Sequence, residues 1–236
     1  FHPVKTMTTG EGGILVTDDD QFAQTARLLR SHGITRDNEE FIGLVDPEIS
    51  ESSSASSDIS AQSTSCHLPS PALAERGPWY YEMQSLGFNF RITDLQCALG
   101  RSQLKRLPGF VSRRRDIVAR YNDALAGLPW LETPGVTDEH DRDEISWHLY
   151  TVQIDFDNIG KSRTEVMSEL REQGIGTQVL YIPVHLQPWY RQTYGYAPGK
   201  CPHAESYYGK ALSLPLYPAM TDSDVKKVVG AVKSLL

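Results

Sequence analysis

The spacing of apolar residues predicts a strand followed by a helix in the first part of the chain. Residues 10–17 join a glycine-rich turn to the apolar run Ile-Leu-Val, a pattern typical of a short buried strand. Three aspartates at 18–20 follow, and any of them could cap the N-terminus of a helix. That helix would carry Phe22 and Leu29 on one face and would end near Gly33.

The stretch from Thr93 to Leu125 predicts two further helices. It opens with the residue spacing of a capping box, so the first helix should begin at Thr93. A second helix is expected after Pro108. Three consecutive arginines at 113–115 lie inside this second helix. Such a run is most often a solvated face, and a phosphate contact is the alternative.

The C-terminal part of the chain predicts alternating strands and helices. Residues 147–155 partly alternate and are rich in strand formers, and residues 177–184 also have the pattern of a strand. Capping boxes that begin at Ser162 and Thr221 each open a helix. This order indicates a small α/β domain over residues 128–236. The apolar stripe of the last helix would consist of Val225, Val228, Val229, Val232 and Leu235.

Residues 50–65 differ in composition from the rest of the chain. More than half of them are serine, and the few apolar residues follow no period. Such a segment cannot bury enough surface to offset the entropy that is lost on ordering. We therefore expect residues 47–75 to form a flexible insertion.

The composition excludes several classes of function. The 236 residues carry a formal net charge of −7, so long-range attraction to nucleic acid or to an anionic membrane is not expected. No apolar run approaches the roughly 20 residues that span a bilayer, and the first residues do not have the pattern of a signal peptide. The chain lacks a starting Met, which indicates a cut or processed start. A cytoplasmic enzyme is the default expectation.

Three cysteines, Cys66, Cys97 and Cys201, are too few and too widely spaced to suggest a disulfide framework. Zinc sites usually need paired Cys and His spacings. Only Cys66 with His67 and Cys201 with His203 are close pairs in the sequence. We therefore expect no metal site.

One lysine, Lys5, stands among hydroxyl and glycine residues just before the predicted strand. A Schiff-base lysine must be able to give up its proton, so it needs a sheltered place near other cationic groups. Neighbouring hydroxyls and glycine amides suit a phosphate-bearing cofactor. From the residues alone, a surface lysine before a glycine-rich turn is the commoner explanation of this pattern.

The whole run Phe-His-Pro-Val-Lys-Thr-Met-Thr-Thr-Gly-Glu-Gly-Gly at residues 1–13 resembles the cofactor-lysine motif of the DegT/DnrJ/EryC1/StrS sugar aminotransferases. Apart from the serine-rich insertion, the resemblance covers nearly the whole chain. Further blocks similar to those of this family lie at residues 31–33, 87–100, 181–190 and 214–218. Residues 77–83 and 147–150 resemble one subgroup, the transaminases that make UDP-4-amino-4,6-dideoxy-N-acetyl-β-L-altrosamine, a precursor of pseudaminic acid.

The resemblance implies a fold class as well as a family. It implies part of an α/β pyridoxal-phosphate-dependent transferase fold of the aspartate aminotransferase type, fold type I. Residues 1–126 would be the C-terminal part of the large cofactor-binding domain, and residues 128–236 would be the small domain. In this family the large domain has an N-terminal portion before the lysine, which holds the aspartate paired with the pyridine nitrogen and most phosphate ligands.

The activity implied by the resemblance is transfer of an amino group from an amino acid, in this family L-glutamate, to a 4-keto nucleotide sugar. Pyridoxal 5′-phosphate would be the cofactor, and Lys5 would hold it and move the proton. Asn89 would reach across a homodimer interface to the cofactor phosphate of the partner subunit. Arg91 would bind an anionic group of the substrate, and His185 would face the sugar.

Each of these residues also has a plainer explanation. Asn89 could be a turn asparagine, Arg91 a member of a structural ion pair, and His185 the end of a strand that leaves the core. Leu180 stands where close relatives often have His, which would alter a sugar contact. For the whole chain, the alternative is a non-catalytic remnant that only dimerises. A related dehydratase fits less well, because those enzymes have lost the lysine that is present here as Lys5.

Overall fold

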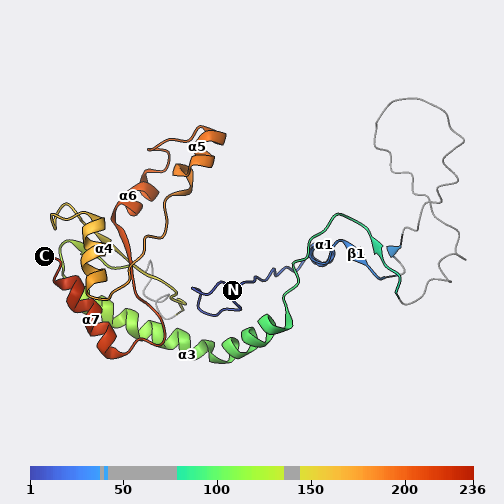
Figure 1. Cartoon of the computed structure of the whole chain (residues 1–236), viewed down its shortest axis with the longest axis horizontal. Helices are drawn as coiled ribbons and strands as arrows, with labels where there is room; N and C mark the ends of the chain where they lie inside the picture. Colours follow the sequence, from blue (N-terminus) through green and yellow to red (C-terminus); the bar gives the residue numbers. More distant parts are fainter. Residues whose placement is uncertain (38–39, 42–78, 136–143) are drawn as a thin grey trace, which may run out of the picture. The chain divides into compact units, whose positions relative to one another are not determined.

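The computed structural model of the chain describes residues 1–37, 40–41, 79–135 and 144–236. These residues form two compact units, each of which is described by itself (Figure 1). The C-terminal unit contains residues 1–12 and 95–236, and the middle unit contains residues 13–94. The predicted serine-rich insertion at 47–75, with Cys66, lies outside the described residues.

The elements follow each other in a mixed α/β order. The described part of the middle unit has α1 (Asp20–Arg30), β1 (Ile34–Thr35) and β2 (Glu82–Met83). Helix α3 (Asp94–Leu125) begins at the last residue of the middle unit and otherwise belongs to the C-terminal unit. The C-terminal unit continues with β3 (Leu131–Glu132), β4 (Tyr150–Ile154), α4 (Arg163–Glu172), η4 (Val184–Leu186), α5 (Pro188–Tyr194), α6 (Pro202–Lys210), β5 (Ala211–Leu214) and α7 (Asp222–Lys233).

Helix α1 confirms the prediction from the aspartate run. The Asp19 carboxylate accepts a hydrogen bond from the Phe22 backbone N–H at 2.9 Å, which caps the first turn. The helix ends at Arg30, and His32 and Gly33 follow with φ of 64° and 68°. This left-handed conformation stops the helix, because further helical hydrogen bonds require negative φ.

The strand predicted at residues 10–17 is not present in the structure. This segment has no regular secondary structure, and Ile14 and Val16 are 77% and 81% exposed. A strand depends on neighbouring strands for its backbone hydrogen bonds. None of the described strands pairs with this segment, so its apolar pattern is not sufficient to make it a strand.

The segment that carries Asn89 is fastened to the last turn of α1. Phe88 donates its backbone N–H to the Leu29 carbonyl at 2.7 Å, and His32 donates to the Phe88 carbonyl at 2.7 Å. Gly33 and Gly87 allow this close approach. A Cβ on Gly87 would lie 2.2 Å from the Gly33 nitrogen, so only glycine fits there.

Helix α3 is one continuous helix of 32 residues, and the prediction of two helices divided at Pro108 is wrong (Figure 1). An internal proline lacks a hydrogen-bond donor and costs about 3 kcal/mol. The second half of α3 buries Ile117, Tyr121 and Leu125, each almost completely. Each such side chain contributes about 1.5–3 kcal/mol on burial, so together they outweigh the cost of the proline.

The core of the C-terminal unit is built on the antiparallel sheet β3-β4-β5. Along β4, Tyr150, Val152 and Ile154 are buried and alternate with partly exposed residues, as the predicted strand requires. Helices α3, α4 and α7 supply the rest of the core. Both predicted capping boxes form, at Ser162 for α4 and at Thr221 for α7. The apolar stripe of α7 packs in this core as predicted.

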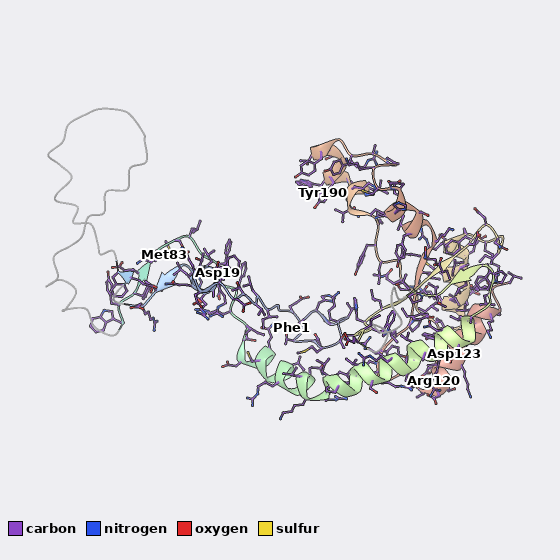
Figure 2. The ribbon with its side chains drawn as sticks, turned by 180° about the vertical axis from the view of Figure 1, so that it is seen from behind. Phe1, Asp19, Met83, Arg120, Asp123 and Tyr190 are labelled. Carbon is purple, nitrogen blue, oxygen red and sulfur yellow. The ribbon has the colours of Figure 1, made fainter. Side chains whose placement is uncertain are left out.

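The strand predicted at residues 177–184 is reduced to one bridge. Gln178 exchanges backbone hydrogen bonds with Ser213 of β5, at 2.8 and 3.2 Å, and the chain then leaves the sheet. The following elements η4, α5 and α6 form an arm of the C-terminal unit. Figure 2 shows Tyr190 in this arm, away from Arg120 and Asp123 on α3.

Substitution of Gly87 by alanine should loosen the middle unit, because the added Cβ cannot fit beside Gly33. Overpacking of this kind typically costs about 1–3 kcal/mol. Amide hydrogen exchange at Phe88 and Phe90, which donate to carbonyls of α1, should become faster in Gly87→Ala.

The matched control is Gly230→Ala in α7, where an added Cβ meets nothing within 4 Å. This change should leave exchange at Phe88 unaltered and stabilise the helix by about 0.5–1 kcal/mol. Unchanged exchange at Phe88 in Gly87→Ala would contradict the close approach described above.

Candidate active site

Residues 1–12 form a closed loop, here called the lysine loop, with Lys5 near its middle. The Lys5 backbone N–H donates to the His2 carbonyl at 3.0 Å, and Thr9 donates to the Phe1 carbonyl at 3.1 Å. The Thr8 hydroxyl donates to the same Phe1 carbonyl at 2.9 Å and accepts the Gly10 N–H at 2.9 Å. The loop therefore satisfies much of its backbone internally and presents Lys5 from a defined turn.

The start of α3 holds the far end of the lysine loop. Thr9 is 5% exposed, and its hydroxyl donates to the Glu11 carbonyl at 2.6 Å. Gln96 of α3 donates its side-chain N–H to the same Glu11 carbonyl at 3.0 Å. A Cβ on Gly100 would lie 2.9 Å from the Thr9 methyl group, so the glycine lets the loop approach the helix. The loop is anchored mainly through main-chain groups.

The segment before β4 supplies the neighbours of Lys5. Lys5 Nζ lies 3.4 Å from Nε2 of His148, and the Thr6 hydroxyl lies 3.2 Å from the Ser146 hydroxyl. Burial lowers the pKa of His148, and the positive charges of Lys5 and Arg114 lower it further. An imidazole with a lowered pKa is neutral at pH 7. No role was expected for His148 from the sequence, although it lies in the predicted strand at 147–155.

A cavity of about 750 Å³ borders Lys5. Its wall includes the hydroxyl residues Thr6 and Thr8, and none of the described residues that line it is Asp or Glu. Its cationic lining consists of Lys5, Lys105, Arg106, Arg113 and Arg114. Such a cavity favours an anionic ligand, because its positive side chains have no carboxylate within the lining.

The three arginines at 113–115 do not form the solvated face that was the preferred prediction. Arg113 binds Asp116, Asp222 and the Met220 carbonyl. Arg115 donates to the Ile145 carbonyl at 3.0 Å. Successive helical residues point about 100° apart, so a run of three cannot share one exposed face.

Arg114 is the most buried of the three, at 6% exposure. Its Nη1 donates to the carbonyls of Leu216, at 2.9 Å, and His148, at 3.3 Å, while its Nε is buried without a hydrogen-bond partner. Burial lowers the pKa of the Arg114 guanidinium, which nevertheless stays charged. Among the described residues, the hydrogen-bond partners of Arg114 are carbonyls, so its positive charge adds to the cationic lining of the cavity beside Lys5.

Asn89 and Arg91 both lie in the middle unit, whereas Lys5 and His185 lie in the C-terminal unit. Asn89 is exposed, and its backbone forms an antiparallel bridge with Ser31. Arg91 Nη2 lies 3.4 Å from Nε2 of His32. The α1 turn therefore fixes the backbone that presents these two side chains. Their predicted roles at the cofactor and substrate stay predictions.

His185 is buried rather than open to a ligand. It is 7% exposed, and its Nε2 lies 2.7 Å from a carboxylate oxygen of Glu205 on α6. Glu205 also accepts backbone hydrogen bonds from Gly199 and Cys201, which with His185 lower its pKa. His185 is not among the residues that line the Lys5 cavity. Its predicted contact with the sugar stays a prediction.

Within the described ranges, no group of three or more His, Cys, Asp or Glu side chains could hold a metal ion. None of the helices in the described part of the chain is long and apolar enough to cross a membrane.

Comparison with known proteins agrees with the resemblance of the lysine loop. SpsC of Bacillus subtilis (strain 168), a spore coat polysaccharide biosynthesis protein, is 38% identical over all of this chain and 52% of its own length. The uncharacterized protein MJ1066 of Methanocaldococcus jannaschii is 36% identical, again over 52% of its length. The chain thus spans about half the length of the curated relatives it matches.

Solved structures show the same fold. PseC of Helicobacter pylori, an aminotransferase involved in the biosynthesis of pseudoaminic acid, superposes with a TM-score of 0.74 and 25% identity. The match covers 100% of this chain and 51% of PseC. Spr1654 of Streptococcus pneumoniae in its PMP-form gives a TM-score of 0.72 and 26% identity, over 100% of this chain and 51% of that one. The chain therefore has part of the sugar aminotransferase fold, as predicted.

The sequence pattern that defines one family matches residues 1–233, almost the whole chain. The lysine loop, the start of α3 and the sheet of the C-terminal unit all lie within this match. The chain belongs to the DegT/DnrJ/EryC1/StrS aminotransferase family.

Proposed function

We propose that this chain carries the catalytic lysine of a pyridoxal-phosphate-dependent sugar aminotransferase. The enzyme would move an amino group from an amino acid, L-glutamate by the family resemblance, to a 4-keto nucleotide sugar. The observation that carries the proposal is the placement of Lys5 at a cationic cavity beside the neutral imidazole of His148. The names of SpsC and PseC support a product used in a surface polysaccharide or in pseudoaminic acid.

The residues of the cavity fit the proposed cofactor. Pyridoxal phosphate brings a phosphate anion, and the cavity offers cationic side chains and the Thr6 and Thr8 hydroxyls without a carboxylate in its described lining. Lys5 would attach the cofactor, and Arg114 would favour its negative charge from the buried side. The PMP-form of the structural neighbour Spr1654 also supports this cofactor.

When bound, the cofactor supplies an electron sink for the carbon that loses its proton. Lys5 has the chemistry to carry that proton, because its neutral amine is a base and its ammonium is an acid at the same Nζ atom. Arg114 provides a fixed positive charge at the same cavity. Lys5 would therefore both anchor the cofactor and transfer the proton.

The remaining residues are assigned by family resemblance as part of this proposal. Asn89 would bind the cofactor phosphate of a partner subunit in a homodimer, and Arg91 would bind an anionic group of the nucleotide sugar. His185, held by Glu205, would shape the sugar side of the site from the arm. We place the enzyme in the cytoplasm, where nucleotide sugars are available.

Capture of the cofactor at Lys5 is the first test. Pyridoxal phosphate mixed with the complete gene product should give a visible absorption band. Reduction with borohydride should then leave a label that mass spectrometry maps to Lys5. Lys5→Ala should lose both the band and the label, and its kcat should fall by roughly 10²–10⁴-fold or more.

The matched control is Lys105→Ala, since Lys105 lines the same cavity and has no assigned attachment role. This variant should still be labelled at Lys5. Labels scattered over surface lysines, or no label, would instead favour the alternative of a non-catalytic remnant.

Arg91→Ala should separate substrate binding from chemistry. Loss of a charge-assisted hydrogen bond should raise the KM for the nucleotide sugar by about ten- to a hundredfold, with kcat changed much less. Steady-state kinetics of the complete gene product would measure both constants. Arg101→Ala, an exposed arginine on α3, is the control and should change neither. An unchanged KM in Arg91→Ala would contradict the proposed substrate contact and leave Arg91 with a structural role beside His32.

A further inference from the structure

His148 is a titratable side chain in contact with Lys5, and the proposed function assigns it no step. Its Nε2 lies 3.4 Å from Lys5 Nζ, although the two residues are separated by 143 positions in the sequence. The neighbouring contact between the Thr6 and Ser146 hydroxyls, at 3.2 Å, aligns the same two segments. Two adjacent side-chain contacts thus hold the lysine loop beside the segment that precedes β4.

The groups around His148 determine whether its imidazole is neutral or charged. A second cavity, of about 260 Å³, borders the imidazole and is lined by Pro3, Val4, Arg114, His148, Leu149, Leu214, Leu216 and Tyr217. Among the described residues, the charged or titratable groups that contact His148 or share its cavity are Lys5 from the lysine loop, Arg114 from α3 and Tyr217 after β5. None of the described residues that line this second cavity is a carboxylate that could stabilise an imidazolium.

The tautomer of His148 follows from its partner. A lysine ammonium has three donors and no acceptor, so Nε2 of His148 can only accept from it. The imidazole proton then resides on Nδ1, and the ring is neutral. Burial and the two cations lower the pKa of His148, which keeps the ring in this neutral, accepting form at pH 7.

We propose that His148 is a positioning residue for Lys5: its neutral imidazole accepts a hydrogen bond from the Lys5 amino group and holds Nζ at the cofactor cavity. This proposal rests on the proposed function, because the position of Lys5 Nζ affects catalysis only if Lys5 binds the cofactor. The contact between Lys5 and His148 is present in the protein without cofactor. The hydrogen bond uses the Lys5 ammonium as donor and the neutral His148 Nε2 as acceptor.

The contact depends on the protonation state of His148. Protonation of His148 would place two cations 3.4 Å apart and remove the acceptor, so the Lys5 side chain would swing away. A lowered pKa means that the folded protein prefers neutral His148. The associated stability is present above the ordinary pKa of histidine and is lost as the pH falls through the lowered value.

The first experiment follows the imidazole of His148 by NMR in the cofactor-free gene product. Lys5→Met removes the nearby ammonium and should raise the pKa of His148 relative to the unsubstituted protein. Lys105→Met removes a charge from the wall of the Lys5 cavity and should leave the His148 titration unchanged. The same His148 titration in the unsubstituted protein and in Lys5→Met would overturn the proposal.

The second experiment compares the rate of cofactor capture at Lys5 in three proteins. His148→Leu has no acceptor, and its rate should fall about two- to tenfold at neutral pH, the size expected for one hydrogen bond. In acid, where protonated His148 also lacks the acceptor, the two rates should converge. His148→Gln keeps an acceptor that does not titrate. The ratio of the unsubstituted rate to the His148→Gln rate should therefore be near one at neutral pH and fall in acid.

Equal rates for all three proteins, with thermal unfolding curves that coincide, would overturn the positioning role. If the unsubstituted protein is not labelled at Lys5, the proposed function fails, while the NMR titration still decides whether His148 and Lys5 are coupled. A slower His148→Leu that is not rescued by His148→Gln would make His148 a packing residue only.

Discussion

The seating of Thr9 against α3 is the contact on which the proposed site depends. Lys5 is carried by a short loop without regular secondary structure, and such a loop keeps a fixed side-chain position only if its ends are held. Thr9 is buried, and Gly100 leaves the space for its methyl group. Gln96 fastens the Glu11 carbonyl one turn earlier on α3. The helix therefore positions the lysine loop, and the loop positions Lys5 beside His148.

A second constraint is the charge of the cavity. Within the part of the chain that the structure describes, Arg114 is buried with carbonyl partners only, and burial of such a cation is costly unless an anion lies nearby. In the proposed enzyme, the positive charge of Arg114 would favour a phosphate-bearing ligand at this cavity. The direction in which α3 presents Arg114 would therefore contribute to cofactor binding in the proposed enzyme.

Features that depend on neighbouring residues could be predicted from the sequence. The caps at Asp19, Ser162 and Thr221 formed as expected, because a cap involves only the next three residues. The strands expected at 10–17 and 177–184 did not form, since a strand needs a partner that its own sequence does not specify.

The candidate site was predictable only in part, for the same reason. Lys5 stood out because its surrounding motif is continuous in the sequence. His148 did not, because its contact with Lys5 depends on the packing of two distant segments. The burial of Arg114 likewise follows from its direction on α3 rather than from its residue type. Pro108 suggested a helix end, and the distant core that α3 joins outweighed this local signal.

Amide hydrogen exchange of residues 1–12 in the cofactor-free protein tests most directly whether the lysine loop is preformed. The Thr9 N–H, bonded to the Phe1 carbonyl, and the Gly10 N–H, bonded to the Thr8 hydroxyl, should exchange at least about tenfold more slowly than in an unstructured peptide. Exchange at the rate of an unstructured peptide would contradict the account, because Lys5 would then have no fixed place beside His148.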